Sequence, residues 1–134
     1  MQKGFFLFIF CLHFFTSKAQ NNAIKITASI PKVLKAGQSY VLKVKVAHNY
    51  NIEKTGNLTC SLLNAKTHKS VDGWFLNIFP FQYFTTIANT PFETEFPFTV
   101  AHEYKDGLDL ELVASVEQIK DSIHLHIPIL KIKP

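Results

Sequence analysis

Hydrophobic and polar residues alternate with a period of two along most of this chain. The alternation is clear in six segments, namely residues 24–30, 40–46, 58–62, 92–100, 108–116 and 123–129, and residues 81–87 can form a further strand. Such alternation is typical of β-strands with one face buried and the other facing water. No stretch of useful length shows helical periodicity. About seven strands at short, regular spacing predict an all-β fold, an immunoglobulin-like antiparallel β-sandwich.

Polar and turn-forming residues separate these segments. Residues 36–38 and 104–107 have turn composition, the polar stretch 48–56 predicts a loop, and residues 119–122 predict the connection to the last strand. Pro128 falls within the last strand pattern. Because proline cannot donate a backbone hydrogen bond, that strand is expected at a sheet edge or with a bulge.

The N-terminal residues have the organisation of a signal peptide. Lys3 gives a positive start, residues 4–15 are almost wholly apolar, and Ser17 and Ala19 provide small residues at a cleavage site before Gln20. We therefore predict a signal peptide over residues 1–19, a single domain over residues 20–134, and a secreted or periplasmic location. A retained membrane anchor is the alternative, but no longer apolar run follows.

Charge and cysteine content narrow the possible functions. All 14 basic residues are lysines, and without Lys3 and Lys18 the remaining 12 stand against 10 acidic residues. A net charge near +2 and the absence of arginine argue against a nucleic-acid-binding protein. Cys60 is the one cysteine of the predicted mature chain, so no internal disulfide is expected. It shares a strand face with leucines, which predicts a buried, inert thiol.

Aromatic residues gather in one segment, Val71–Thr85. Two interpretations stay open for it: packing within the core, or a contact surface for a partner protein or a sugar ring. Strict alternation fails across residues 73–79, so these side chains cannot all face one core. The candidate binding residues are Trp74, Phe75, Phe79, Phe81 and Tyr83.

The same segment, V-D-G-W-F-L-N-I-F-P-F-Q-Y-F-T, resembles one in bacterial α2-macroglobulin-like proteins. Residues 31–37 are similar to the P-x-x-L-x-x-G entry of the sandwich domain that precedes the thioester region in that family. Residues 40–49 and 127–130 resemble its early strand and its exit. The likeness extends over residues 24–132, and it implies a macroglobulin-like β-sandwich.

The resemblance does not carry over the family's chemistry. The family traps proteases with a bait segment and, in many members, a thioester motif C-x-E-Q. Here the nearest string is Ser115-Val116-Glu117-Gln118, which lacks the cysteine. The resemblance therefore implies a stand-alone domain without bait or thioester.

Few residues are candidates for catalysis or metal binding. His124 and His126 are two apart on a predicted strand and so share a face, a spacing that can place two imidazoles on one metal ion. The alternative is a solvent-facing pair, since no third ligand is indicated, and we predict neither a metal site nor a cofactor. Acidic pairs such as Glu93 with Glu95 are read as solvated strand charges. The motifs of hydrolases, zincins and nucleotide-binding enzymes are absent.

These observations predict an exported, non-enzymatic interaction module. Its expected partner is an envelope or macroglobulin-like protein, with no nucleic acid and no membrane insertion after signal removal. An alternative is a carbohydrate-binding sandwich that uses Trp74 and Tyr83 as platforms. A third hypothesis is a small hydrolase or metal enzyme that uses His124 and His126.

Overall fold

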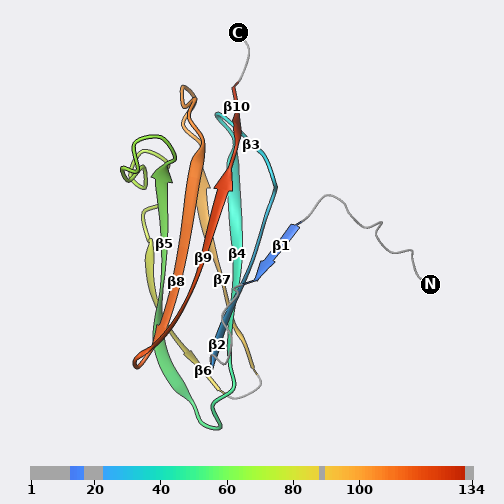
Figure 1. The fold of residues 1–134 in the computed structure, drawn as a ribbon, viewed down its shortest axis with the longest axis vertical. Helices are drawn as coiled ribbons and strands as arrows, with labels where there is room; N and C mark the ends of the chain where they lie inside the picture. The colour runs from blue at the N-terminus through green and yellow to red at the C-terminus, as the bar shows by residue number, and fades with distance from the viewer. Residues whose placement is uncertain (1–12, 17–22, 88–89, 132–134) are drawn as a thin grey trace, which may run out of the picture.

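A computed structural model describes residues 13–16, 23–87 and 90–131 of the chain. These residues contain strands and no helix (Figure 1). In chain order the strands are β1 (His13–Thr16), β2 (Ile24–Ile30), β3 (Leu34–Lys35), β4 (Ser39–His48), β5 (Lys54–Asn64), β6 (Phe81–Thr86), β7 (Phe92–Thr99), β8 (Leu108–Val116), β9 (Ile119–Ile127) and β10 (Ile129–Leu130).

The strands form an antiparallel β-sandwich, which confirms the predicted fold class. One sheet has the order β1-β2-β4-β7 and the other the order β6-β5-β8-β9. The two sheets lie face to face along the long axis of the molecule (Figure 1). The seven strands β2 and β4 to β9 correspond to the seven predicted segments. The three short strands β1, β3 and β10 are additional.

The prediction was wrong at two strand starts. β5 begins at Lys54, inside the expected loop. β9 begins at Ile119, so only Glu117 and Gln118 connect it to β8, and Glu117 adopts a positive φ of 56° in this tight turn. The alternation hid the start of β9 because the first buried position of this strand is a carboxylate, Asp121.

Two short strands close one end of the sandwich. β3 pairs with β10 in parallel, an exception to the antiparallel pattern. Leu34 N donates to Pro128 O at 3.1 Å, and Ala36 N donates to Leu130 O at 2.9 Å. Pro128 separates β9 from β10, and β9 is the last strand of its sheet, as the position of this proline predicted.

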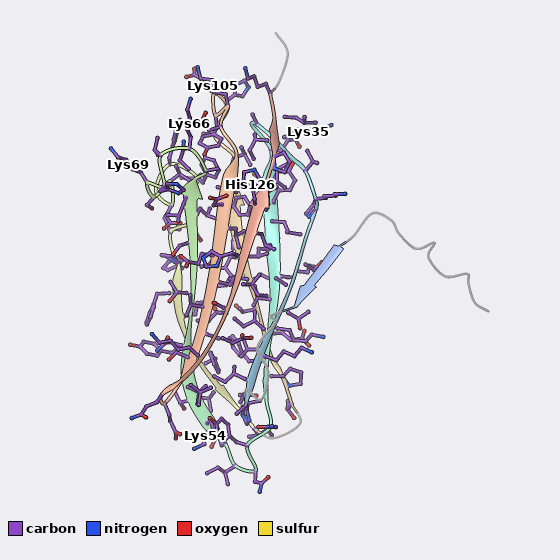
Figure 2. The ribbon with its side chains drawn as sticks, in the orientation of Figure 1. Lys35, Lys54, Lys66, Lys69, Lys105 and His126 are labelled. Atoms are coloured by element: carbon purple, nitrogen blue, oxygen red, sulfur yellow. The ribbon has the colours of Figure 1, made fainter. Side chains whose placement is uncertain are left out.

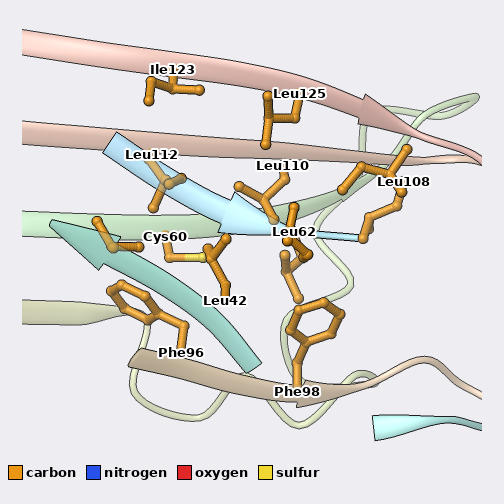
Figure 3. Packing of buried hydrophobic residues seen from close by; sticks show 14 of the residues in the cluster. Leu42, Cys60, Leu62, Phe96, Phe98, Leu108, Leu110, Leu112, Ile123 and Leu125 are labelled. Carbon is orange, nitrogen blue, oxygen red and sulfur yellow. The ribbon is translucent and has the colours of Figure 1, made fainter. Parts of the chain in front are cut away.

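The core lies between the two sheets. Leu42, Phe96 and Phe98 from one sheet face Leu62 and leucines of β8 from the other (Figure 3). Every second residue of β8, from Leu108 to Val116, is buried. The large side chains thus interdigitate from both sheets, as in other aligned sandwiches.

Long polar side chains cover the outside. Figure 2 labels Lys35, Lys66, Lys69 and Lys105 at one end of the sandwich and Lys54 at the other.

The predicted signal peptide falls mostly outside the described residues, as do its cleavage site and Cys11. Of residues 1–19, only β1 is described, and it pairs with the outer edge of β2.

Candidate functional site

The segment Val71–Pro80 forms the second part of the connection between β5 and β6, and it is fixed to both sheets. The carboxylate of Asp72 accepts a hydrogen bond from Leu62 N at 2.8 Å and another from the side-chain amide of Asn77 at 2.9 Å. The same amide donates to Cys60 O at 3.0 Å. Phe75 O in turn accepts from Thr99 N of β7 at 2.8 Å. The segment therefore has a defined conformation although it contains no strand.

Phe75 lies in the core and is fully buried. Its ring is stacked on Phe98, with centroids 6.4 Å apart, and meets Tyr104 edge-on at 4.8 Å. This position corrects the prediction for Phe75, which cannot contact a partner directly. The physical reason is the turn at residues 71–76, where Phe75 N donates to Val71 O and directs the ring inward.

The residues around Phe75 expose apolar side chains. Leu76 is 58% exposed, Ile78 69% and Phe79 73%, whereas the polar Asn77 between them is buried. This is the reverse of the usual arrangement, in which apolar residues are buried and amides face water. Leu76 also adopts a positive φ of 62°, which is rare for a leucine. The core therefore does not account for these outward-facing side chains.

Leu76, Ile78 and Phe79 line an open, mainly apolar groove of about 780 Å³. From β6 the groove receives Phe81, which is 48% exposed, and Gln82. Its other wall comes from β4 and β7 and consists of Ser39, Tyr40, Val41, Glu95, Pro97, Phe98 and Thr99. The groove lies where the edge strands of the two sheets, β6 and β7, approach each other. We call it the aromatic groove.

The edge of β7 offers little to a backbone partner. Thr99 N is already bonded to Phe75 O. Residues two apart direct their backbone groups to the same edge, so Pro97 is the next outward position, and proline has no N–H. A ligand in the aromatic groove is therefore recognised through side chains rather than by extending the sheet.

Trp74 and Tyr83 are both exposed, at 58% and 72%. Trp74 packs edge-on against Tyr104, with ring centroids 5.6 Å apart. Tyr83 packs at 89° against Phe81, with centroids 5.0 Å apart. Neither ring lines the aromatic groove, and each is held by a different neighbour. They provide two separate aromatic surfaces.

His124 and His126 lie on the outer face of β9, and Figure 2 labels His126 there. Each ring is paired across the ladder with a carboxylate of β8: His124 Nε2 lies 2.7 Å from Glu111 Oε2, and His126 Nδ1 lies 2.7 Å from Asp109 Oδ1. Among the described residues, no three His, Cys, Asp or Glu side chains are grouped to hold a metal ion. The two histidines thus have the solvent-facing arrangement that the sequence left open.

Cys60 is buried in the core face of β5. Burial raises the pKa of its thiol to about 12, and the negative charge of Asp72 raises it further. A hydrogen bond with the side chain of Asn77 acts in the opposite direction and lowers this pKa. The thiol is therefore protonated at physiological pH and is a poor nucleophile.

Most groove residues were not candidates from the sequence, and four of them are exposed and apolar: Leu76, Ile78, Val41 and Pro97. Two of them had a signal. Val41 and Pro97 are opposite each other on the outer face of β4 and β7, among lysines and glutamates, so each breaks an otherwise polar strand face. Leu76 and Ile78 lie in a segment without periodicity, where the direction of a side chain cannot be read from the sequence.

Comparisons with known proteins support the fold alone. No family model matches the chain, and no curated protein matches it. A β-glucosidase from Listeria innocua, solved in complex with isofagomine, is similar in structure, with a TM-score of 0.52 and 11% identity over 84% of this chain and 17% of that chain. The same enzyme in complex with glucose gives a TM-score of 0.49 and 12% identity, over 89% of this chain and 16% of that one.

The chain therefore spans less than a fifth of the enzyme that it resembles. Identity this low indicates a common sandwich architecture and carries no information on activity. None of the described residues forms a helix that is long and apolar enough to cross a membrane.

Proposed function

We propose that this chain is an exported, non-enzymatic interaction module that binds an apolar segment of a partner protein in the aromatic groove. One observation carries the proposal: Leu76, Ile78 and Phe79 face solvent in one groove while the polar Asn77 among them is buried. Contiguous apolar surface of this kind is unfavourable in water, and it marks sites where another protein docks.

The groove also has the anatomy of a small protein interface. Aromatic and aliphatic side chains form its centre, and the polar residues Ser39, Gln82 and Glu95 lie among its lining. Aromatic anchors at the centre of an interface commonly carry most of the binding energy. The hydrogen bonds of Asp72 and Asn77 hold the segment in place before binding, which lowers the entropic cost of association.

Selection of a displayed peptide library on the purified chain tests this function. The test variant combines Leu76→Ser, Ile78→Ser and Phe79→Ser, all on the groove wall. The matched control combines Ile52→Ser, Ile87→Ser and Leu130→Ser, which remove apolar side chains of 52–62% exposure outside the groove. We expect peptides rich in aromatic and aliphatic residues, with affinity lost by more than about tenfold in the test variant and kept in the control. Selected peptides that bind both variants equally contradict the proposal.

The partner itself is expected to be an envelope or macroglobulin-like protein, in line with the resemblance of the sequence. A photo-crosslinking residue in place of Phe79, compared with one in place of Ile52, tests this in envelope extracts. The proposal requires a product specific to position 79. Products of equal yield from both positions, or from neither, count against a dedicated partner.

A carbohydrate-binding sandwich is the second candidate, supported by the exposure of both Trp74 and Tyr83. Sugar-binding aromatic surfaces act by stacking, so Trp74→Ala and Tyr83→Ala are each expected to abolish retardation in polysaccharide gels if this function holds. Because neither ring lines the aromatic groove, the triple serine variant leaves this activity unchanged. The two functions are thereby separable.

A further inference from the structure

The outer edge of β2 has two parts with different partners. Near the start of the strand, Ile26 N donates to the buried carboxylate of Asp121, 3.0 Å away on β9 of the other sheet. Ile26 therefore directs its backbone away from β4, toward the open edge. Residues two apart on a strand face the same edge, so Ala28 and Ile30 direct their backbone groups outward as well.

In this structure β1 occupies the second part of that edge. β1 runs antiparallel to β2, with Phe15 opposite Ala28 and His13 opposite Ile30. An extended tetrapeptide thus fits beside β2 in regular register. Residues 1–19, to which β1 belongs, are the segment that the sequence predicts to be removed on export. Once they are removed, the backbone groups of Ala28 and Ile30 lose these neighbours.

This edge lacks the features that protect sheet edges. The opposite edge of the same sheet, β7, carries Pro97 and is bonded through Thr99 N to Phe75 O. Between Thr27 and Ile30 the β2 edge has no proline, no bulge and no charged residue. Edges of this kind readily accept an additional strand.

We propose that the edge of β2 at Thr27–Ile30 accepts an extended segment of a different protein, with apolar residues at every second position, which adds antiparallel to β2 where β1 now lies. The proposal rests on the predicted removal of residues 1–19 and is independent of the aromatic groove, since β2 and β7 lie on opposite sides of β4.

The register also defines the chemistry of the incoming strand. Residues opposite each other in a ladder lie on the same face of the sheet. A residue opposite Ala28 or Ile30 therefore lies on the core side, because both of these side chains are 1% exposed and point inward. The intervening residues lie beside Thr27 and Ser29 on the outer face. The site thus fits a segment with apolar residues at every second position.

A synthetic peptide of residues 11–18, with serine in place of Cys11 and a fluorescent label, serves as the probe. Two full-length chains are compared by fluorescence anisotropy. In Phe15→Pro, the proline removes the N–H that faces Ala28, so β1 is expected to leave the edge. In the matched control Phe14→Pro, the lost N–H faces away from β2, because Phe14 lies opposite Ser29.

The peptide is expected to bind Phe15→Pro at least about tenfold more tightly than Phe14→Pro. A peptide N-methylated at the residue equivalent to Phe15 is expected to lose this binding, whereas N-methylation at the residue equivalent to Phe14 leaves it unchanged. Adding Ala28→Pro to the Phe15→Pro chain removes the N–H of Ala28, which would otherwise donate to the incoming peptide. This change is expected to abolish binding.

Equal affinity for both chains, or equal effects of the two N-methylations, overturns the proposal. A second copy of the chain is the competing occupant of the edge. If Phe15→Pro forms dimers in sedimentation experiments and the peptide does not dissociate them, the edge serves self-association and the proposal is wrong. Loss of the groove function through the triple serine variant leaves peptide binding at β2 unaffected, so the two proposals fail separately.

Discussion

The side-chain amide of Asn77 lies 2.9 Å from the carboxylate of Asp72, and this contact holds the wall of the aromatic groove against β5. Asp72 also accepts from Leu62 N, and Asn77 also donates to Cys60 O. Asp72 and Asn77 thus form hydrogen bonds with Leu62 N and Cys60 O of β5, two backbone groups that no neighbouring strand bonds. Hydrogen bonds of this kind are costly to lose because buried partners are left unpaired.

Replacement of Asp72 tests this role. Asp72→Ala leaves Leu62 N and the Asn77 amide without their acceptor and is expected to lower the free energy of unfolding by roughly 2–4 kcal/mol. The control Asp109→Ala removes a carboxylate whose partner, His126, is on the surface, and should cost at most about 1 kcal/mol. Urea denaturation of both variants measures the difference. Similar losses in the two variants contradict the anchoring role.

Phe75 and Phe79 are four residues apart and have opposite environments. Phe75→Ala removes a fully buried ring and is expected to destabilise the fold by about 3–5 kcal/mol. Phe79→Ala removes a ring that is 73% exposed, and its effect should stay within about 0.5 kcal/mol. Chemical denaturation distinguishes the two. A large loss in Phe79→Ala would show that this ring supports the fold rather than a contact.

Alkaline pH is expected to destabilise the protein. Burial raises the pKa of the Tyr104 phenol to about 12 from 10.0, with Asp106 and Asp109 adding to the effect. Burial likewise raises the pKa of Cys60 to about 12 from 9.0. Both groups ionise more easily in the unfolded chain than in the folded one. Their contribution to the free energy of unfolding is therefore complete below about pH 9 and is lost as the pH rises toward 12.

Tyr104→Phe isolates one of these contributions. The phenol donates to Gly107 O at 2.7 Å, so the variant is less stable at neutral pH. Its free energy of unfolding should nevertheless fall less steeply than that of the wild type above pH 10, in urea titrations at successive pH values. Parallel curves for the two proteins would exclude Tyr104 as a source of the alkaline sensitivity.

Gly56 is required by a close approach of β5 to its neighbours. A Cβ atom at this position would clash with Ser115 O and would lie 2.7 Å from Val116 Cγ2. Gly56→Ala is therefore expected to cost about 1–3 kcal/mol or more through overpacking. A Cβ atom at Gly73 meets no atom within 4 Å, so Gly73→Ala serves as the control and should be nearly neutral. Thermal unfolding of both variants provides the comparison.

The sequence predicted the strands because burial and exposure alternate from one residue to the next along them. Each of β2, β4 and β8 has one face in the core, so a period of two appears directly in the residue types. The pattern failed where a polar residue is buried for a specific hydrogen bond. Asp121 accepts from Ile26 N, which no feature of either local sequence indicates.

The candidate site was less predictable than the fold. The aromatic segment was identified, and Phe79 and Phe81 do line the groove. The sequence did not separate Phe75 from Phe79, because the direction of each ring depends on the turn at Val71–Leu76 and on contacts with β7. Neither the turn nor the contacts with β7 can be recognised from the residues of this segment. The resemblance to macroglobulin domains stays a prediction from the sequence.

The parallel pairing of β3 with β10 has a mechanical consequence. Both strands run along the long axis at the end of the sandwich where β10 terminates (Figure 1). Tension applied to Lys131 along that axis loads the bonds to Pro128 O and Leu130 O in shear, so both must break together. Tension across the axis would instead open them in sequence. The β3–β10 end of the sandwich should therefore resist pulling along the long axis better than pulling across it.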